Sequence, residues 1–452
     1  MRMRIGAGPL RPFLFSTAAG TAVLQILLLA FWIAPARAAG NAAAPLTIAE
    51  GLRIVAKDSR IVKIAERDRD ITSTDVLIAR SQYLPDINAS TSQTFLAYEP
   101  GAKFGALAAP TAQRSSFAYG FDVRQLLYDF GERSSLLRAS RVTLGSARLN
   151  IDRVRNIASL DFITTYFDLL ESEKMVLVAQ QEVGRLESHK KVAGDLYSEG
   201  VITKNDLLQA EVKLSDAQQA LLTAGNRRAI IASRLNTILA RPLGTEVRAV
   251  DVPVKPPVLP DIDKAWETAE RQRIELKALD NELRTAGLEE QGQKSEYFPR
   301  LFADGGYNYT ENRYLTHQDN WSLVLGATFN IFNGGATKAG IAKVRYREER
   351  LLEQRKKAED DIRLEVERSY FDMKNAMDKI AVTRDAVGQA EENLKINKVK
   401  YSEGVGTATD VLDAITLLTT AETNHYRAIY DLQRARADYM YAIGANLTAE
   451  YK

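Results

Sequence analysis

Cysteine is absent from the 452 residues of this chain. Disulfides, thiolate metal sites and cysteine nucleophiles are therefore excluded, and no lipid can be attached through a cysteine. Histidine is scarce as well: the chain has only His189, His317 and His425, which are far apart in the sequence and have no ligand-like neighbours. We therefore expect all three histidines to be surface residues, and we expect no metal or other cofactor.

The chain has no excess of charge of one sign. Its 60 lysines and arginines nearly balance 58 acidic residues, so the net charge is +2. No long basic block appears, which gives no reason to expect a nucleic-acid partner. The sequence also contains no phosphate-binding loop, serine-hydrolase elbow or zinc-protease motif, and an enzyme is not expected.

Long apolar runs are missing except at the beginning of the chain. Residues 21–33 are apolar, arginines precede them, and Ala36-Arg37-Ala38 follows as a cleavage-type motif. We interpret residues 1–38 as a signal peptide. An uncleaved anchor is the alternative, although the run is shorter than the ~20 residues of a spanning helix. If the rest of the chain crosses a membrane, it must do so with β-strands.

The chain is internally duplicated. The run Y-S-E-G-V at 401–405 has a copy 204 residues earlier, at 197–201. Upstream, Y-F-P at 297–299 corresponds to Y-L-P at 83–85. We predict a first repeat at 39–244, a proline-rich linker at 245–260, and a second repeat at 261–452. Their length exceeds that of short solenoid repeats, so two large units are expected.

Each repeat has the same predicted order of elements. A helix leads into a strand pair, at 86–130 and at 300–333, and a long helical hairpin follows, at 132–240 and at 337–444. In the strands, apolar residues alternate with small or polar ones, which is typical of β-structure. The stretch 97–110, rich in Gly, Ala and Pro, is expected to be a loop.

The first helix of each hairpin has a coiled-coil pattern. Apolar residues recur every seven positions at Val366, Met373, Ile380, Val387, Leu394 and Tyr401. The other copy repeats this pattern at Phe162, Leu169, Val176, Val183 and Tyr197, interrupted by Lys190. A strict heptad predicts left-handed supercoiling against a partner helix. Each of these helices would be ~100 Å long.

Four strands per chain are too few to close a barrel, and open sheet edges are not tolerated in lipid. Three chains would supply twelve strands. A small β-sandwich packed against helices has the same alternation and remains the structural alternative. The matching functional alternative is a periplasmic coiled-coil scaffold or adaptor without its own pore.

The segment Y-S-E-G-V-G-T-A-T-D-V-L-D-A at 401–414 resembles the helix-turn-helix signature of the TolC family of outer-membrane efflux proteins, and 197–206 resembles the sister motif. The resemblance covers the duplicated layout, the strand pairs and both bends. It implies an α+β membrane protein: a homotrimer with a 12-stranded outer-membrane β-barrel and an α-helical periplasmic tunnel. It also implies the exit duct of a tripartite efflux or type I secretion system. The partners would be outer-membrane lipid, a periplasmic adaptor, and an inner-membrane pump of the RND, ABC or MFS type.

The resemblance also implies roles for individual residues. Asp410 and Asp413 match the entrance gate and selectivity positions, where three chains would supply six carboxylates. Asp206 and Tyr401 match positions that link the closed gate by hydrogen bonds. The matched tips for adaptor docking are Gly200, Val201, Gly404, Val405 and Thr407.

Two positions depart from the family pattern, because Gly406 stands where an arginine is usual and Asn205 replaces a threonine. An arginine latch is therefore not expected, and the closed state must be held differently or less tightly. Simpler interpretations of the acidic residues remain open. Asp206 and Asp410 would also suit the caps of the returning helices, and Asp413 would suit a solvated face.

Overall fold

The computed structural model describes residues 45–253, 259 and 261–451. The predicted signal peptide and part of the predicted linker lie outside the described residues. Among the described residues, no helix combines the length and the apolar character that crossing a membrane would need.

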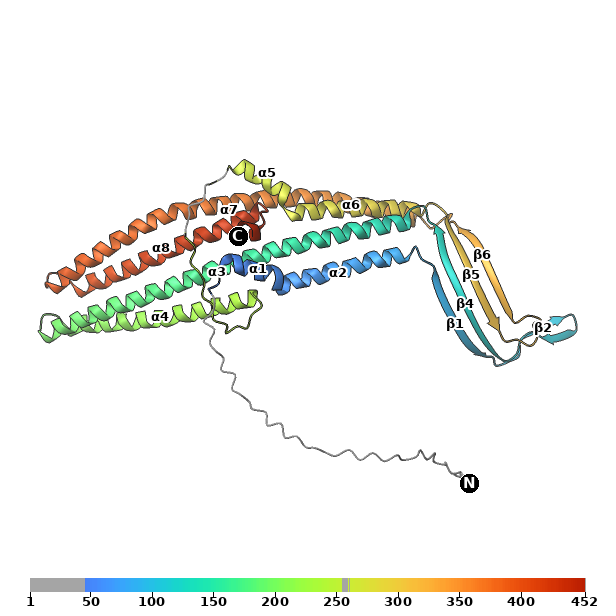
Figure 1. Ribbon diagram of the computed structural model, residues 1–452, viewed down its shortest axis with the longest axis horizontal. Helices are drawn as coiled ribbons and strands as arrows, with labels where there is room; N and C mark the ends of the chain where they lie inside the picture. Colours follow the sequence, from blue (N-terminus) through green and yellow to red (C-terminus); the bar gives the residue numbers. More distant parts are fainter. Residues whose placement is uncertain (1–44, 254–258, 260, 452) are drawn as a thin grey trace, which may run out of the picture. The chain divides into compact units, whose positions relative to one another are not determined.

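The helices show the duplication in their lengths (Figure 1). The two copies of each element have equal length: 11, 22, 67 and 35 residues. The first repeat has α1 (Ile48–Asp58), α2 (Arg60–Ser81), α3 (Glu132–Ser198) and α4 (Lys204–Ile238). The second has α5 (Ile262–Gln272), α6 (Ile274–Ser295), α7 (Ala336–Ser402) and α8 (Ala408–Ala442), followed by the short α9 (Leu447–Glu450).

The leading helix of each repeat is broken, although the sequence pattern predicts a continuous one. Ser59 separates α1 from α2 with φ −55° and ψ 132°, and Arg273 separates α5 from α6 with φ −59° and ψ 124°. These are extended conformations within otherwise helical segments. Arg273 is buried and pairs with Glu275 and Glu365. Tertiary contacts of this kind are invisible to local periodicity, which explains the wrong prediction.

Four strands form one antiparallel sheet in the order β1-β4-β5-β6 (Figure 1). The strands are β1 (Asp86–Phe95), β4 (Ser115–Tyr128), β5 (Arg300–Thr310) and β6 (Asp319–Thr328). The pairing of β4 with β5 joins the two repeats. The expected loop at 97–110 is instead a small hairpin of β2 (Gly101–Phe104) and β3 (Leu107–Pro110). Its tight turn contains Gly105 with φ +67°, a conformation that favours glycine.

The sheet has one apolar and one polar face. Residues paired across antiparallel strands point to the same side, and Phe121, Tyr307 and Trp321 are paired in this way. The other face contains the ion pair of Arg124 with Asp304, whose closest atoms are 2.9 Å apart. All ten residues of β1 are exposed, and so are most of β6. Within the part of the chain that the structure describes, no helix or second sheet covers these faces, so the β-sandwich interpretation is wrong.

The main core lies where α3 meets α1, α4, α8 and α9. Phe162 and Leu169, two of the predicted heptad positions, are fully buried there. Gly51 of α1 allows the close approach, because a Cβ at that position would lie 1.9 Å from Cζ of Phe162. The Tyr166 hydroxyl donates to the carbonyl of Leu46 at 2.8 Å. This core fixes the base from which both long hairpins extend.

A buried ion pair lies at the end of α3 nearest the sheet. The Arg133 Nε is 2.7 Å from Oδ2 of Asp129, and both side chains are buried. The same guanidinium donates to the backbone carbonyls of Gln82, Leu126 and Leu127. One side chain therefore connects the end of α2, the end of β4 and the start of α3.

Replacing Asp129 with Ala should destabilise the protein, because it leaves the buried guanidinium without its carboxylate. The expected loss is about 3–5 kcal/mol in the free energy of unfolding, measured from the urea dependence of the helical circular dichroism signal in detergent. Arg363→Ala is the matched control, since its pair with Glu270 is exposed and such pairs contribute little. Equal losses of unfolding free energy in the two variants would contradict a stabilising role for the buried pair of Asp129 and Arg133.

Candidate functional site at the helical turns

Both long hairpins turn with the same backbone geometry. Gly200 and Gly404 have φ values of +72° and +73°, which a residue with a Cβ adopts at a cost. In each turn the next amide donates back to the ending helix: Val201 N to Leu196 O, and Val405 N to Lys400 O, both at 2.9 Å. This is the usual hydrogen-bonded end of a helix that stops at glycine.

Each returning helix begins with a capping box. The Asp206 carboxylate accepts from Thr203 N at 3.1 Å, and the Asp410 carboxylate accepts from Thr407 N at 3.0 Å. The threonine hydroxyls accept from the aspartate amides in return. Two otherwise unsatisfied donors are paired in each cap. The capping interpretation of both aspartates is therefore confirmed, and it leaves their proposed roles at an entrance untested.

Asp410 is exposed and charged at neutral pH. The hydrogen bonds from Thr407 hold the pKa of its carboxyl below the ordinary value. Crowding of like charges in a ring would act in the opposite direction. Within one chain, the cap therefore favours the ionised form of Asp410.

Asp413 follows one turn later on α8 and is also exposed. It lines a groove of about 350 Å³ between α8 and α4, together with Asn205, Leu208 and Leu412. Asp410 is not among the residues that line this groove. The two aspartates thus share the start of α8, but Asp413 faces the neighbouring hairpin.

Tyr401 is buried at 3% exposure, in a cluster with Leu186 of α3 and Ile415 of α8. Its hydroxyl has no hydrogen-bond partner among the described residues. Burial raises the pKa of Tyr401, and the negative charge of Asp206 raises it further. The charge of Asp206 thus acts on Tyr401, and the hydrogen bond predicted between the two side chains stays a prediction.

His189 is the residue that sequence reasoning misjudged. It is 4% exposed, not a surface residue, and its ring centroid lies 5.1 Å from that of Tyr401. Burial, followed by the positive charge of Lys398, lowers the pKa of its imidazole. The available signal in the sequence was the neighbouring Lys190, which interrupts the heptad of apolar residues.

A second unpredicted feature joins the two hairpins farther from the turns. Arg185 of α3 donates to both carboxylate oxygens of Glu422 on α8, one of them at 2.8 Å. Both side chains are largely buried. Nearby on α3, burial raises the pKa of Glu182. A bidentate pair of this kind fixes the relative position of two helices.

The predicted docking tips are accessible. Gly200, Gly404 and Thr407 are exposed, as are the side chains of Val201 and Val405. Gly406 lies inside the second tip, where a Cβ would be 3.0 Å from Cβ of Lys400. A side chain at 406 would therefore require its neighbours in the turn to give way.

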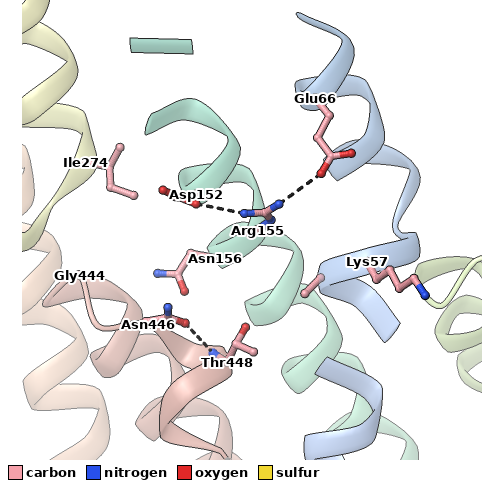
Figure 2. A pocket seen from close by; sticks show the side chains of 10 residues that line it. Lys57, Glu66, Asp152, Arg155, Asn156, Ile274, Gly444, Asn446 and Thr448 are labelled. Carbon is pink, nitrogen blue, oxygen red and sulfur yellow. Dashed lines mark hydrogen bonds and ion pairs between the residues drawn. The ribbon is translucent and has the colours of Figure 1, made fainter. Parts of the chain in front are cut away.

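The structure also has a charged cavity of about 720 Å³, lined by α1, α2, α3, α6 and the segment after α8 (Figure 2). Arg155 lies between two of its carboxylates, with Nη2 at 3.2 Å from Glu66 and Nη1 at 3.3 Å from Asp152. None of the sequence-predicted site residues lines this cavity. In the described ranges, no group of acidic and histidine side chains is arranged to hold a metal ion.

Comparison with known proteins agrees with this geometry. The family described as "Outer membrane efflux protein" matches residues 55–241 and again 266–445. The chain is 22% identical to nodulation protein T of Rhizobium leguminosarum bv. trifolii, over 83% of this chain and 80% of that protein. It is 21% identical to the outer membrane efflux protein BepC of Brucella suis biovar 1 (strain 1330), over 91% and 88%.

Among solved structures, the CmeC outer membrane channel of Campylobacter jejuni has the same fold. The TM-score is 0.76 at 14% identity, and the match covers 88% of this chain and 85% of that one. The family matches once in each repeat, so the internal duplication predicted from the sequence is confirmed. The chain belongs to the outer membrane efflux protein family, and it is an outer-membrane efflux channel with a periplasmic helical tunnel, not an enzyme.

Proposed function

We propose that three copies of this chain form a closed 12-stranded barrel in the outer membrane, with the long helices forming the tunnel. The observation that carries this proposal is the sheet with two exposed faces. Its apolar face suits lipid and its polar face suits a wet lumen. β1 and β6 are edge strands within the chain, and backbone groups in lipid must be paired.

We also propose the division of the chain that the sequence suggests. The first repeat at 39–244 and the second at 261–452 each supply two of the four sheet strands and one long hairpin. The linker at 245–260 connects them. In a trimer, six such repeats would alternate around the axis.

In this proposal the channel is the exit duct of a tripartite efflux or type I secretion assembly. The tips at Gly200, Val201, Gly404, Val405 and Thr407 bind a periplasmic adaptor, which connects the duct to an inner-membrane pump. The support is their exposure at the two turns. An exposed valine within each turn offers an apolar anchor. Cargo is then selected by the pump, which can be of the RND, ABC or MFS type.

The entrance of the tunnel is assigned to the turn between α7 and α8. Asp410 and Asp413 of three chains would place six carboxylates there. A ring of carboxylates favours cations and repels anions. Asp206 and Tyr401, which interact electrostatically within the chain, are proposed to help hold the two turns together in the closed state.

The trimer is tested with the purified, detergent-extracted protein. We expect a mass in detergent of three chains and small, cation-selective currents in a planar bilayer. A monomeric protein without conductance would overturn the proposal and would restore the periplasmic scaffold as the better interpretation.

The entrance ring is tested with Asp410→Asn combined with Asp413→Asn. Asparagine keeps an acceptor oxygen for the cap of α8 but removes the charge. Block of single-channel current by added multivalent cations should be abolished. Asp195→Asn, at an exposed position of α3 near the sister turn, is the matched control and should leave the block intact. Unchanged block in the double variant would reject the assignment.

The docking tips are tested with Val201→Glu combined with Val405→Glu. A charge at each exposed tip should prevent adaptor binding without disturbing the barrel. Cells that depend on the variant should lose export, while the purified variant keeps the wild-type conductance. Normal export by these cells would exclude the tips as the docking surface.

A further inference from the structure

The two turns are copies of one sequence, yet their tyrosines lie in different environments. Tyr197 is 41% exposed, whereas its counterpart Tyr401 is 3% exposed. Tyr401 lies in an apolar cluster of α3, α7 and α8, and His189 of α3 also packs against its ring. In the second repeat the position equivalent to His189 is Asn393. This aromatic contact between the hairpins therefore exists once per chain.

The contact leaves two polar atoms buried without partners. Nε2 of His189 and the hydroxyl of Tyr401 each have no hydrogen bond within the described part of the chain. A buried polar group without a partner destabilises the state that buries it. A charge there is costlier still. The packed arrangement thus tolerates a neutral imidazole and opposes a protonated one.

We propose that His189 is a further gate residue, whose neutral ring holds Tyr401 in the closed state and whose protonation releases the turn between α7 and α8. This inference rests on the proposed entrance at that turn. It deepens the proposal by naming a positioning residue and a proton as its effector. It also explains how the gate is held closed in a chain that has Gly406 in place of an arginine.

The charges around His189 agree with this assignment. On α7, Lys398 lies one turn before Tyr401, and its positive charge acts with burial to lower the pKa of His189. Lys398 would repel an imidazolium directly. On α8, the carboxylate of Glu422 is bound by Arg185.

The remaining charged neighbours lie on α3 and α4. Lys190 of α3 pairs with Glu211 of α4, at 3.2 Å. Asp206 of α4 is bonded to its own cap residue Thr203. Glu182 of α3 has a raised pKa because it is buried. In the described residues, no carboxylate is hydrogen-bonded to His189, so nothing compensates a positive charge on its ring.

The direction of the pH effect follows from the lowered pKa. A solvated histidine has a pKa of about 6.5. The closed contact is therefore intact above about pH 6.5 and is progressively lost as the pH falls below it. For each unit by which closure lowers the pKa, full protonation shifts the balance toward the open state about tenfold per chain. The pKa of Asp410 lies below its ordinary acidic value, so its titration falls outside this window.

The test is the open probability of the purified trimer in a planar bilayer between pH 8 and pH 5, at constant ionic strength. Wild-type protein should open increasingly as the pH falls below about 6.5. His189→Phe keeps an aromatic ring but cannot be charged, and it should stay closed throughout. His189→Arg carries a permanent charge and should be open already at pH 8. His425→Gln is the matched control, because this second histidine, bonded to Thr383, is not at the turn.

Two further variants separate the possible failures. If Glu182→Gln abolishes the acid response while His189→Phe preserves it, the carboxyl group is the sensor and the inference is overturned. A wild-type response in both His189→Phe and the conservative His189→Gln overturns it equally. Variants are compared only as trimers with wild-type circular dichroism. A protein with no conductance at any pH refutes the channel proposal itself, whereas a pH-independent channel whose cation block depends on Asp410 and Asp413 refutes only the role of His189.

Discussion

The edges of the four-stranded sheet impose the main constraint on this molecule. Along β1 and β6, a row of backbone donors and acceptors has no partner strand among the described residues. Both faces of the sheet are also uncovered in the described residues, including an apolar face with Phe121 and Trp321. A free edge is tolerated in water only when pairing is prevented, and it is not tolerated in lipid. In the proposed trimer, other copies of the chain would continue the sheet at both edges.

The helices, unlike the sheet edges, satisfy their backbone hydrogen bonds within the chain. Their backbone groups bond within each helix, and their apolar residues pack between neighbouring helices. At the hairpin turns, α3 and α7 stop at a glycine, and α4 and α8 begin with a threonine–aspartate capping box. Such helices extend far from the core without requiring a sheet or a domain around them. The two hairpins of one chain are joined by a few specific contacts, among them the pairs of Arg185 with Glu422 and of Arg434 with Glu171. Largely buried pairs of this kind fix the position of one hairpin against the other.

Duplication supplied two similar hairpins, and packing made them different. The turns have matching backbone angles and matching caps. Tyr401 is nevertheless enclosed by α3, while Tyr197 remains exposed. The same motif therefore leaves its tyrosine exposed in one repeat and encloses it in the other, because the surrounding helices differ.

The sequence by itself determined the elements, their duplicated order and the family. Heptads, alternating strands, glycine turns and capping residues are local patterns, and local patterns express hydrogen bonding along one segment. The helix break at Arg273 and the burial of His189 were decided only by the tertiary structure, because they depend on which distant residues meet: Arg273 with Glu365 and His189 with Tyr401. The hairpin at 101–110 pairs residues that are close in the sequence, but the glycine- and alanine-rich composition of this stretch did not reveal it. The burial and the pKa of a side chain depend on all the residues around it. In this chain those residues come from both repeats.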